Sequence, residues 1–172
     1  MQQLPNKNIK AGFTLIELII VIIILGIIVV TGLPKFLNIS KDTKSAVLYK
    51  LAGDMTSLNE QVHAKTIIIG KDKTSGNAYF DTNLGEVNVF NGYLETIGEG
   101  GSKIGIFEMV GVSNINDFTL SSEVGYCAYR RGGFGDLGTP ASSNLGDSCF
   151  IEYKEACNLN VKYTITIVDT GC

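Results

Sequence analysis

One carboxylate lies where a carboxylate is costly. Glu17 interrupts an apolar run in which 15 of the 18 residues from Phe13 to Val30 are hydrophobic. Such a charge inside a bilayer costs on the order of a few kcal/mol, so a segment selected only for insertion would not carry it. If the chain is cut after Gly12, the new amine of Phe13 lies four residues from Glu17. In an array of parallel, axially staggered helices, that amine can meet the carboxylate of a neighbouring subunit and set the register.

The cysteines are the second group of residues with a chemistry of their own. They are Cys127, Cys149, Cys157 and Cys172. All four lie in the half of the chain that would be exported, and their number is even, so we expect disulfides. No C-x-x-C pair is present and His63 is the one histidine, which makes a zinc site improbable and gives no metal ligands to assign.

Other patterns that could do chemistry have simpler interpretations. The segment Gly133–Gly138 matches G-x-G-x-x-G, but Thr139-Pro140 follows it. A dinucleotide site needs a helix opening at that point, so a surface loop is favoured. His63 has no obvious serine, cysteine or carboxylate partner, and we expect it to pack or to face solvent. No nucleophile–base set or P-loop is visible, so we expect no enzyme and no cofactor.

Two short polar segments remain open. Residues 81–86, DTNLGE, gather oxygen ligands that could hold Ca²⁺, although the full 12-residue loop pattern is missing. Asn38-Ile39-Ser40 is an N-glycosylation sequon by pattern only, and we assign it no role.

Charge is distributed unevenly along the chain. Residues 1–12 carry +2, residues 13–34 carry −1, residues 35–73 carry +3 and residues 74–172 carry −7, which gives the net charge of −3. An acidic C-terminal region has no basic field to collect phosphates, so general nucleic-acid binding through it is disfavoured.

The first element that positions Glu17 is a predicted helix that is apolar enough to cross a membrane. The 21 residues from Phe13 to Leu33 match the ~20 residues that a helix needs to span a bilayer. A secretory signal peptide is disfavoured, because the apolar run is long and no small-x-small cleavage site follows Val30. A plain anchor with its basic leader on the cytoplasmic side is the simpler alternative. Pro34 would kink this helix rather than necessarily end it.

An amphipathic helix is predicted to follow, over about 35–66. Its apolar positions recur at spacings of three and four, with lysines and Asn59 between them. These positions are Phe36, Val47, Leu51, Met55, Leu58 and Val62. Together the two stretches predict one helix of about 50 residues, whose apolar stripe the rest of the chain should cover.

The C-terminal region is rich in glycine and predicts short elements. Residues 70–102 read as loops with one strand, at 86–90, and residues 103–110 weakly favour a helical turn. Further strands are predicted at 117–121, 124–131, 149–155 and 161–168. The fold class is therefore α+β, a long helix packed on an antiparallel sheet.

The last two predicted strands bear on the disulfides. If they form a hairpin around 158–160, Cys149 and Cys172 could face each other across its open end. That arrangement leaves Cys127 with Cys157. Four cysteines allow three pairings, and the other two stay open.

The N-terminal residues also carry a family resemblance. The sequence Gly12-Phe13-Thr14-Leu15-Ile16-Glu17, an Ile/Val/Leu run and Pro34 resemble the class III signal of type IV prepilins. More loosely, residues 34–39, 149–156 and 171–172 resemble the mannose-sensitive haemagglutinin subgroup of type IVa pilins.

The resemblance implies an organisation and a set of partners. A prepilin peptidase would remove the leader, 1–12, and the amine of Phe13 would be methylated. The long helix would be 13–66, with 13–33 as membrane span and filament core, and Glu17 would pair with a neighbour's Phe13. Residues 67–172 would form the pilin head, with the Cys149–Cys172 loop displayed.

The resemblance also implies where the protein works and with what. The precursor would lie in the inner membrane of a Gram-negative bacterium, in lipid and beside an assembly platform with its ATPase. Identical subunits would then form an extracellular filament for adhesion. The alternatives are a type II secretion pseudopilin and a minor pilin that takes up DNA, for which Arg130 and Arg131 would be the first residues to mutate.

Overall fold

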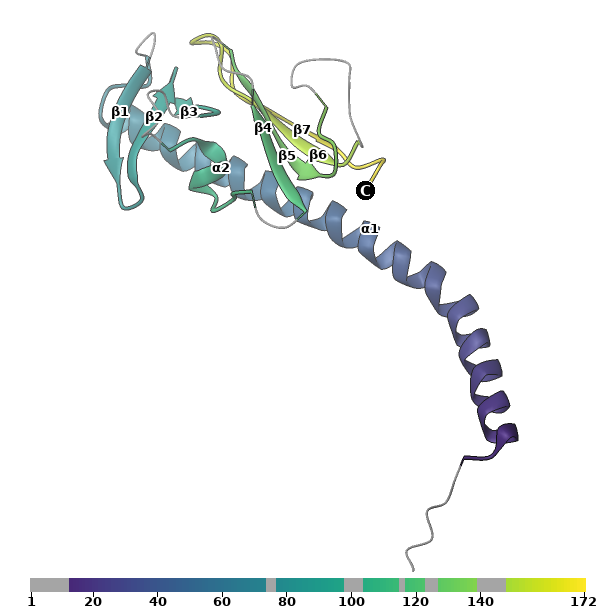
Figure 1. Ribbon diagram of the computed structural model, residues 1–172. Coiled ribbons are helices and arrows are strands. Elements are labelled where there is room, and N and C mark those ends of the chain that lie inside the picture. Colours follow the sequence, from purple (N-terminus) through teal and green to yellow (C-terminus); the bar gives the residue numbers. More distant parts are fainter. Residues whose placement is uncertain (1–12, 74–76, 98–103, 115–116, 123–126, 139–147) are drawn as a thin grey trace, which may run out of the picture. The chain divides into compact units, whose positions relative to one another are not determined.

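The computed structural model describes residues 13–73, 77–97, 104–114, 117–122, 127–138 and 148–172 (Figure 1). The expected leader, 1–12, lies outside these residues. The chain divides into two compact units, Met1–Ser40 and Lys41–Cys172, which we call the N-terminal unit and the head. Helix α1, Leu15–Ile68, contributes residues to both.

The described part of the N-terminal unit is the apolar half of α1. The helix is long and apolar enough to cross a membrane by length and composition, and its most apolar window has a mean hydropathy of 3.1. Side chains from Phe13 to Phe36 are exposed. Pro34 lies within α1, so the helix continues past the position where one backbone donor is missing.

In the head, α1 buries one stripe of side chains against two sheets. The buried positions are Leu48, Leu51, Met55, Asn59, Val62 and Thr66. The predicted stripe was wrong at three places. Phe36, which it included, is 77% exposed. Val47 is 41% exposed and Leu48 is fully buried instead, whereas Asn59, expected among the outward polar residues, is fully buried. Hydrophobicity could not reveal this, because a buried amide is tolerated only where its hydrogen bonds are satisfied.

The first sheet is an antiparallel meander of three strands. These are β1 (Asn77–Thr82), β2 (Gly85–Phe90) and β3 (Tyr93–Leu94), in that spatial order. The strand predicted at 86–90 is β2, but β1 and β3 lie where loops were expected. The sequence of β1, NAYFDT, contains Asn and Asp, which are depleted in strands, and only the pairing with β2 makes it one.

A short helix, α2 (Ile106–Met109), connects the two sheets and agrees with the helical turn that the sequence weakly favoured. Ile106 and Phe107 on α2 are fully buried.

The second sheet has four antiparallel strands in chain order. These are β4 (Phe118–Ser122), β5 (Tyr129–Phe134), β6 (Phe150–Lys154) and β7 (Thr164–Val168). The predicted hairpin of the last two strands is present, with Phe150 opposite Val168.

Strand β5 continues beyond the predicted end at Arg131, and residues 124–126 of that prediction lie outside the described part. Gly133, which was expected in a surface loop, and Gly132, which follows the predicted strand end, are both strand residues in crowded places. A Cβ on Gly132 would lie 2.6 Å from Cε1 of Phe107, and one on Gly133 would lie 2.3 Å from the carbonyl oxygen of Cys149. Glycine is required here by close approach rather than by a bend.

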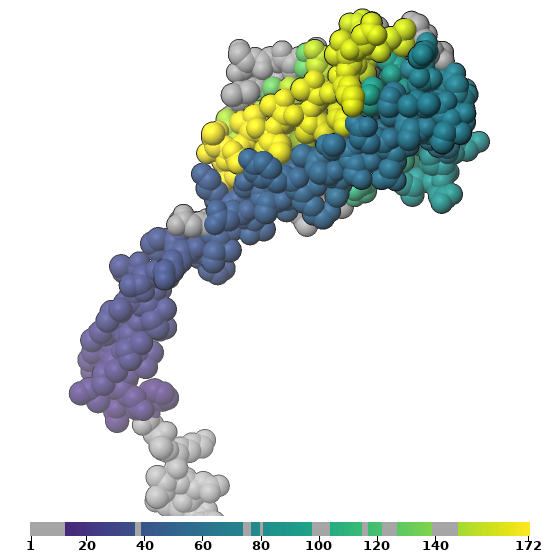
Figure 2. Space-filling view, turned by 180° about the vertical axis from the view of Figure 1, so that it is seen from behind, coloured from purple at the N-terminus to yellow at the C-terminus, as the bar shows by residue number. Residues whose placement is uncertain are grey.

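The architecture is α+β, a long N-terminal helix followed by antiparallel sheets, as expected for a pilin fold. The two sheets share one core with the head portion of α1, and this core includes Met55 of α1, Val87 and Val89 of β2, and Ile151 of β6. Figure 2 shows the C-terminal strand lying along α1 in the head, where Ser45 donates a hydrogen bond to Asp169 at 3.1 Å.

Candidate functional site

The N-terminus of α1 is closed by a reciprocal pair of hydrogen bonds. The backbone N–H of Glu17 donates to Oγ1 of Thr14 at 3.3 Å, and the backbone N–H of Thr14 donates to Oε2 of Glu17 at 3.4 Å. The Thr14 hydroxyl also lies 3.3 Å from Oε2. This is a capping box, in which each side chain satisfies a backbone donor that the helix leaves unpaired.

Sequence reasoning missed Thr14. The pattern Thr-x-x-Glu before an apolar run is a known signature of a helix start, so the signal was present. Glu17 was treated only as the partner of a neighbouring amine. The structure gives it a second role within its own subunit, at the helix end where the macrodipole also favours negative charge.

The surface around this cap is apolar and open. Phe13 is 81% exposed, and Leu15 and Ile16 beside Glu17 are 75% and 67% exposed. Gly12, on the other side of the expected cleavage point, lies outside the described residues. The pairing of Glu17 with a second copy therefore stays a prediction, whereas the cap within the subunit is observed.

A family comparison covers this part of the chain. Residues 7–33 match the prokaryotic N-terminal methylation motif. The chain carries the class III signal of type IV pilins. A search of curated proteins and one of solved structures each found no match.

The motif has consequences for how the protein works. It implies processing by a prepilin peptidase and assembly into a pilus-like polymer. It also points to a structural protein, a precursor of the type IV pilin or pseudopilin kind, and not to an enzyme. The apolar helix and the motif together are consistent with a membrane-anchored precursor.

Two disulfides close the C-terminal part of this pilin-like chain. Cys149 is bonded to Cys172 and Cys127 to Cys157, with Cα separations of 4.7 and 4.9 Å. These are the pairs that the hairpin argument favoured. Cys149 directly precedes β6, and Cys172 follows β7, so the first bond spans the open end of that hairpin.

Arg130 and Arg131 are committed to the fold of the head. Arg130 forms a bidentate ion pair with Glu108, at 2.7 and 2.8 Å. Arg131 pairs with Glu152 at 2.7 Å and donates to the carbonyl of Leu137 at 2.7 Å. The two are 9% and 2% exposed, because neighbours in a strand point to opposite faces and both faces are covered here. The suggestion that they contact DNA was therefore wrong.

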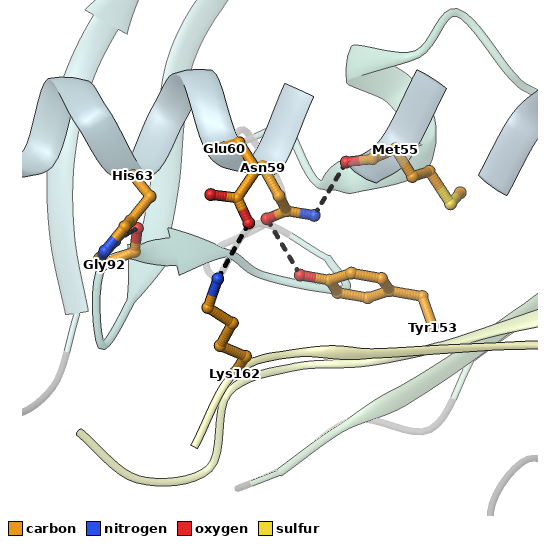
Figure 3. A network of polar contacts seen from close by, with 7 residues as sticks. All are labelled: Met55, Asn59, Glu60, His63, Gly92, Tyr153 and Lys162. Carbon is orange, nitrogen blue, oxygen red and sulfur yellow. Dashed lines mark hydrogen bonds and ion pairs between the residues drawn. The ribbon is translucent and has the colours of Figure 1, made fainter. Parts of the chain in front are cut away.

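His63 has a packing role, as expected. Its ring stacks on Tyr93 with centroids 4.3 Å apart, and Nδ1 lies 3.1 Å from the carbonyl oxygen of Gly92 (Figure 3). A proton on Nδ1 lets the ring donate a hydrogen bond to that carbonyl.

The two loop motifs also have structural roles. Gly133 lies inside β5, and residues 139–147, where a dinucleotide-binding helix would have to begin, are outside the described part. Residues 81–86 form the β1–β2 turn, in which Thr82 Oγ1 donates to the Gly85 carbonyl at 2.7 Å. Among the described residues, no group of three or more His, Cys, Asp or Glu side chains is placed to hold a metal ion.

A buried polar cluster connects α1 to both sheets. Oδ1 of Asn59 accepts a hydrogen bond from the backbone N–H of Leu94 at 3.1 Å and lies 3.3 Å from the hydroxyl of Tyr153. That hydroxyl donates to the Leu94 carbonyl at 2.7 Å. Nδ2 of Asn59 donates to the Met55 carbonyl (Figure 3). Burial raises the pKa of Tyr153 well above its ordinary value, so the hydroxyl stays protonated. Sequence reasoning had no signal for this cluster.

Proposed function

We propose that this protein is a structural subunit of a type IV pilus, of the mannose-sensitive haemagglutinin-like kind. It polymerises into a filament on the surface of a Gram-negative bacterium, where the filament serves adhesion and surface attachment, with motility as a further role. The observation that carries the proposal is the methylation motif at residues 7–33, of which residues 15–33 lie on a helix whose apolar side chains are exposed.

Maturation prepares the interface. Cleavage between Gly12 and Phe13 removes the leader 1–12 and creates an amine, which is then methylated. The apolar half of α1 lies in lipid before assembly and among neighbouring helices afterwards. Extraction is tolerable because both environments satisfy the same apolar surface. The force comes from the assembly platform and its ATPase.

Glu17 joins the subunits through the amine of a neighbour's Phe13. Both bonds from Thr14 end on Oε2, so the carboxylate can keep its cap while Oε1 receives that amine. In surroundings of low dielectric, such a pair is strongly attractive and removal of one partner leaves a buried charge. The globular region 67–172, with its disulfide-bonded C-terminus, then covers the filament.

Glu17→Gln separates the two roles of this residue. Glutamine can serve in a capping box, so the helix start is retained, but the charge that attracts the amine is lost. We expect normal precursor levels, membrane insertion and cleavage, with surface filament reduced by about tenfold or more, since a buried unpaired charge costs several kcal/mol. Immunoblots of cells and of sheared surface material would measure both.

Thr14→Val is the matched variant, because it removes the capping hydroxyl and keeps the charge. It should reduce filament yield far less than Glu17→Gln. If Glu17→Gln assembles normally, the charge pair is not what sets the register, and capping alone accounts for Glu17.

A pseudopilin remains the second candidate, because the methylation motif is common to both kinds of precursor. Intact mass and N-terminal sequencing of the mature protein should show a start at methylated Phe13, and a start elsewhere would contradict the proposed processing. Sheared surface filaments with this chain as their chief component would exclude a short periplasmic fibre.

A further inference from the structure

An apolar hollow of about 350 Å³ lies in the head between α1 and the segment from α2 to β4. Its apolar lining comes from Val47, Leu51, Val110, Val112, Phe118 and Phe134. Lys50 and Asp54 of α1 pair with each other at its edge. The hollow explains why Val47, expected to be buried, is 41% exposed: no other part of the described chain fills the space in front of it.

The distal end of α1 presents the opposite shape. Ile67, Ile68 and Ile69, which we call the isoleucine triplet, are 53%, 83% and 42% exposed. A Schellman motif fixes them, with the N–H of Gly70 on the Ile67 carbonyl at 3.0 Å and that of Lys71 on the Thr66 carbonyl at 2.8 Å. The triplet is therefore a rigid apolar projection rather than a frayed helix end.

We propose that the isoleucine triplet of one subunit docks into the apolar hollow of the next subunit along the filament. The occupant of the hollow is thus a second copy of this chain. This inference rests on the proposed function, and it names the head surfaces through which subunits meet.

The positions of the two surfaces along α1 suit a staggered array. Leu51 at the hollow and Ile68 in the triplet are 17 residues apart. At ~1.5 Å per residue, that is about 26 Å of helix. In a parallel array, one copy can be shifted by that distance along the helix axis, toward its own N-terminus, relative to its neighbour. The isoleucine triplet of the shifted copy then lies level with the hollow of the neighbour.

The two surfaces also suit an open polymer. They are different patches of one chain, so contact between them is heterologous. A heterologous contact repeats from copy to copy and extends a filament, whereas a self-complementary patch would close a dimer.

The test uses the full chain in cells that assemble it. A photo-crosslinking benzophenone residue at position 68 should give, in sheared filaments, a species of twice the subunit mass. Peptide mapping should place its attachment on Val47, Val110, Val112 or Phe118. The same probe at Leu84, which is 61% exposed on the β1–β2 turn, is the control and should give no attachment to the hollow.

A matched pair of substitutions supplies the second readout. Ile68→Lys should lower filament yield by about tenfold or more, since burial of one isoleucine is worth about that factor. Leu84→Lys should leave the yield within about twofold, because single exposed apolar side chains carry little stability. Both positions are exposed, so both variants should keep their disulfides and precursor levels.

The outcomes distinguish this inference from the proposed function. Normal filaments from Ile68→Lys, or attachment of the probe to another surface, would overturn the docking and leave the pilin proposal standing. A wild-type chain that forms no filaments under any assembly condition would overturn both.

Discussion

The two halves of α1 share one continuous backbone but differ in where their apolar side chains find partners. In the N-terminal unit these side chains are exposed on every side, as for Ile20 at 50% and Val30 at 75%. In the head they form one stripe, where Leu48 and Met55 are fully buried. A helix that is apolar all round needs partners from outside the chain, whereas a striped helix finds them in its own fold. The contrast separates the assembly element from the folding element.

Truncation of one apolar side chain in each half of α1 should give the largest difference in head stability. Met55→Ala should destabilise the head by about 2–5 kcal/mol, because it removes buried methylenes and leaves a cavity. Ile20→Ala should leave the unfolding free energy of the head unchanged. Urea unfolding of the full chain in detergent measures this, because all seven tyrosines lie in residues 41–172 and near-ultraviolet circular dichroism of tyrosine therefore reports the head alone. Equal destabilisation by the two variants would mean that the halves fold as one unit.

Substitution of Asn59, a polar residue in the buried stripe, should give the next largest effect on head stability. Asn59→Ala leaves the backbone N–H of Leu94 without its acceptor in the core. The expected loss is about 1–3 kcal/mol in the same urea experiment, the cost of a buried unsatisfied donor. Gln61→Ala is the control, because Gln61 is exposed and, among the described residues, bonds only to Ser57 of its own helix. It should change stability by less than about 0.5 kcal/mol. A neutral Asn59→Ala would show that the cluster does not hold α1 to the sheets.

The same comparison shows what sequence could predict. Periodicity and composition predicted α1 to within two residues at each end, and alternation predicted β6 and β7 with the hairpin that brings Cys149 toward Cys172. These features are local. The motif around Glu17 was also local, and the capping box with Thr14 was there to be found by its spacing.

The predictions that failed concern residues whose positions depend on tertiary contacts. Asn59 was assigned to the outer face because a polar side chain reads as exposed, and only its bonds to β3 and β6 explain its burial. The predicted strand ended before Gly132, and Gly133 was assigned to a loop, because sequence does not reveal that Phe107 and Cys149 lie against β5. The predicted helix ended at residue 66, so the isoleucine triplet was not recognised as part of an exposed helix end; nothing in the described chain covers it.

Two carboxylates extend the contrast between the halves. Glu17 takes its partners at an exposed helix end, and the proposed amine comes from another subunit. Glu155 is 8% exposed and takes its partners within the head. Its Oε1 accepts from the backbone N–H of Ala128 at 2.8 Å, and its Oε2 lies 3.4 Å from the hydroxyl of Thr96. It thus connects the segment after β3 to the segment before β5.

The smallest expected effect is a dependence of head stability on pH through Glu155. Burial is the main cause that raises the pKa of this carboxyl above its ordinary value of 4.5, and the N–H groups of Ala128 and Thr96 offset it in part. The folded state therefore holds the proton more tightly than the unfolded state. Its stabilising contribution is full below pH 4.5 and is lost as pH rises through the folded pKa.

Glu155→Gln keeps the shape of the side chain and removes its titration. Unfolding free energies in urea would be measured from about pH 4 to about pH 7, which covers the range in which carboxyl groups titrate. They should fall more steeply with rising pH for the wild-type head than for this variant. If Glu155→Gln keeps the wild-type slope, Glu155 is not a buried titrating group. The head would then resemble the N-terminal unit, in which the carboxylate lies at the surface and its energetics depend on what a second subunit brings to it.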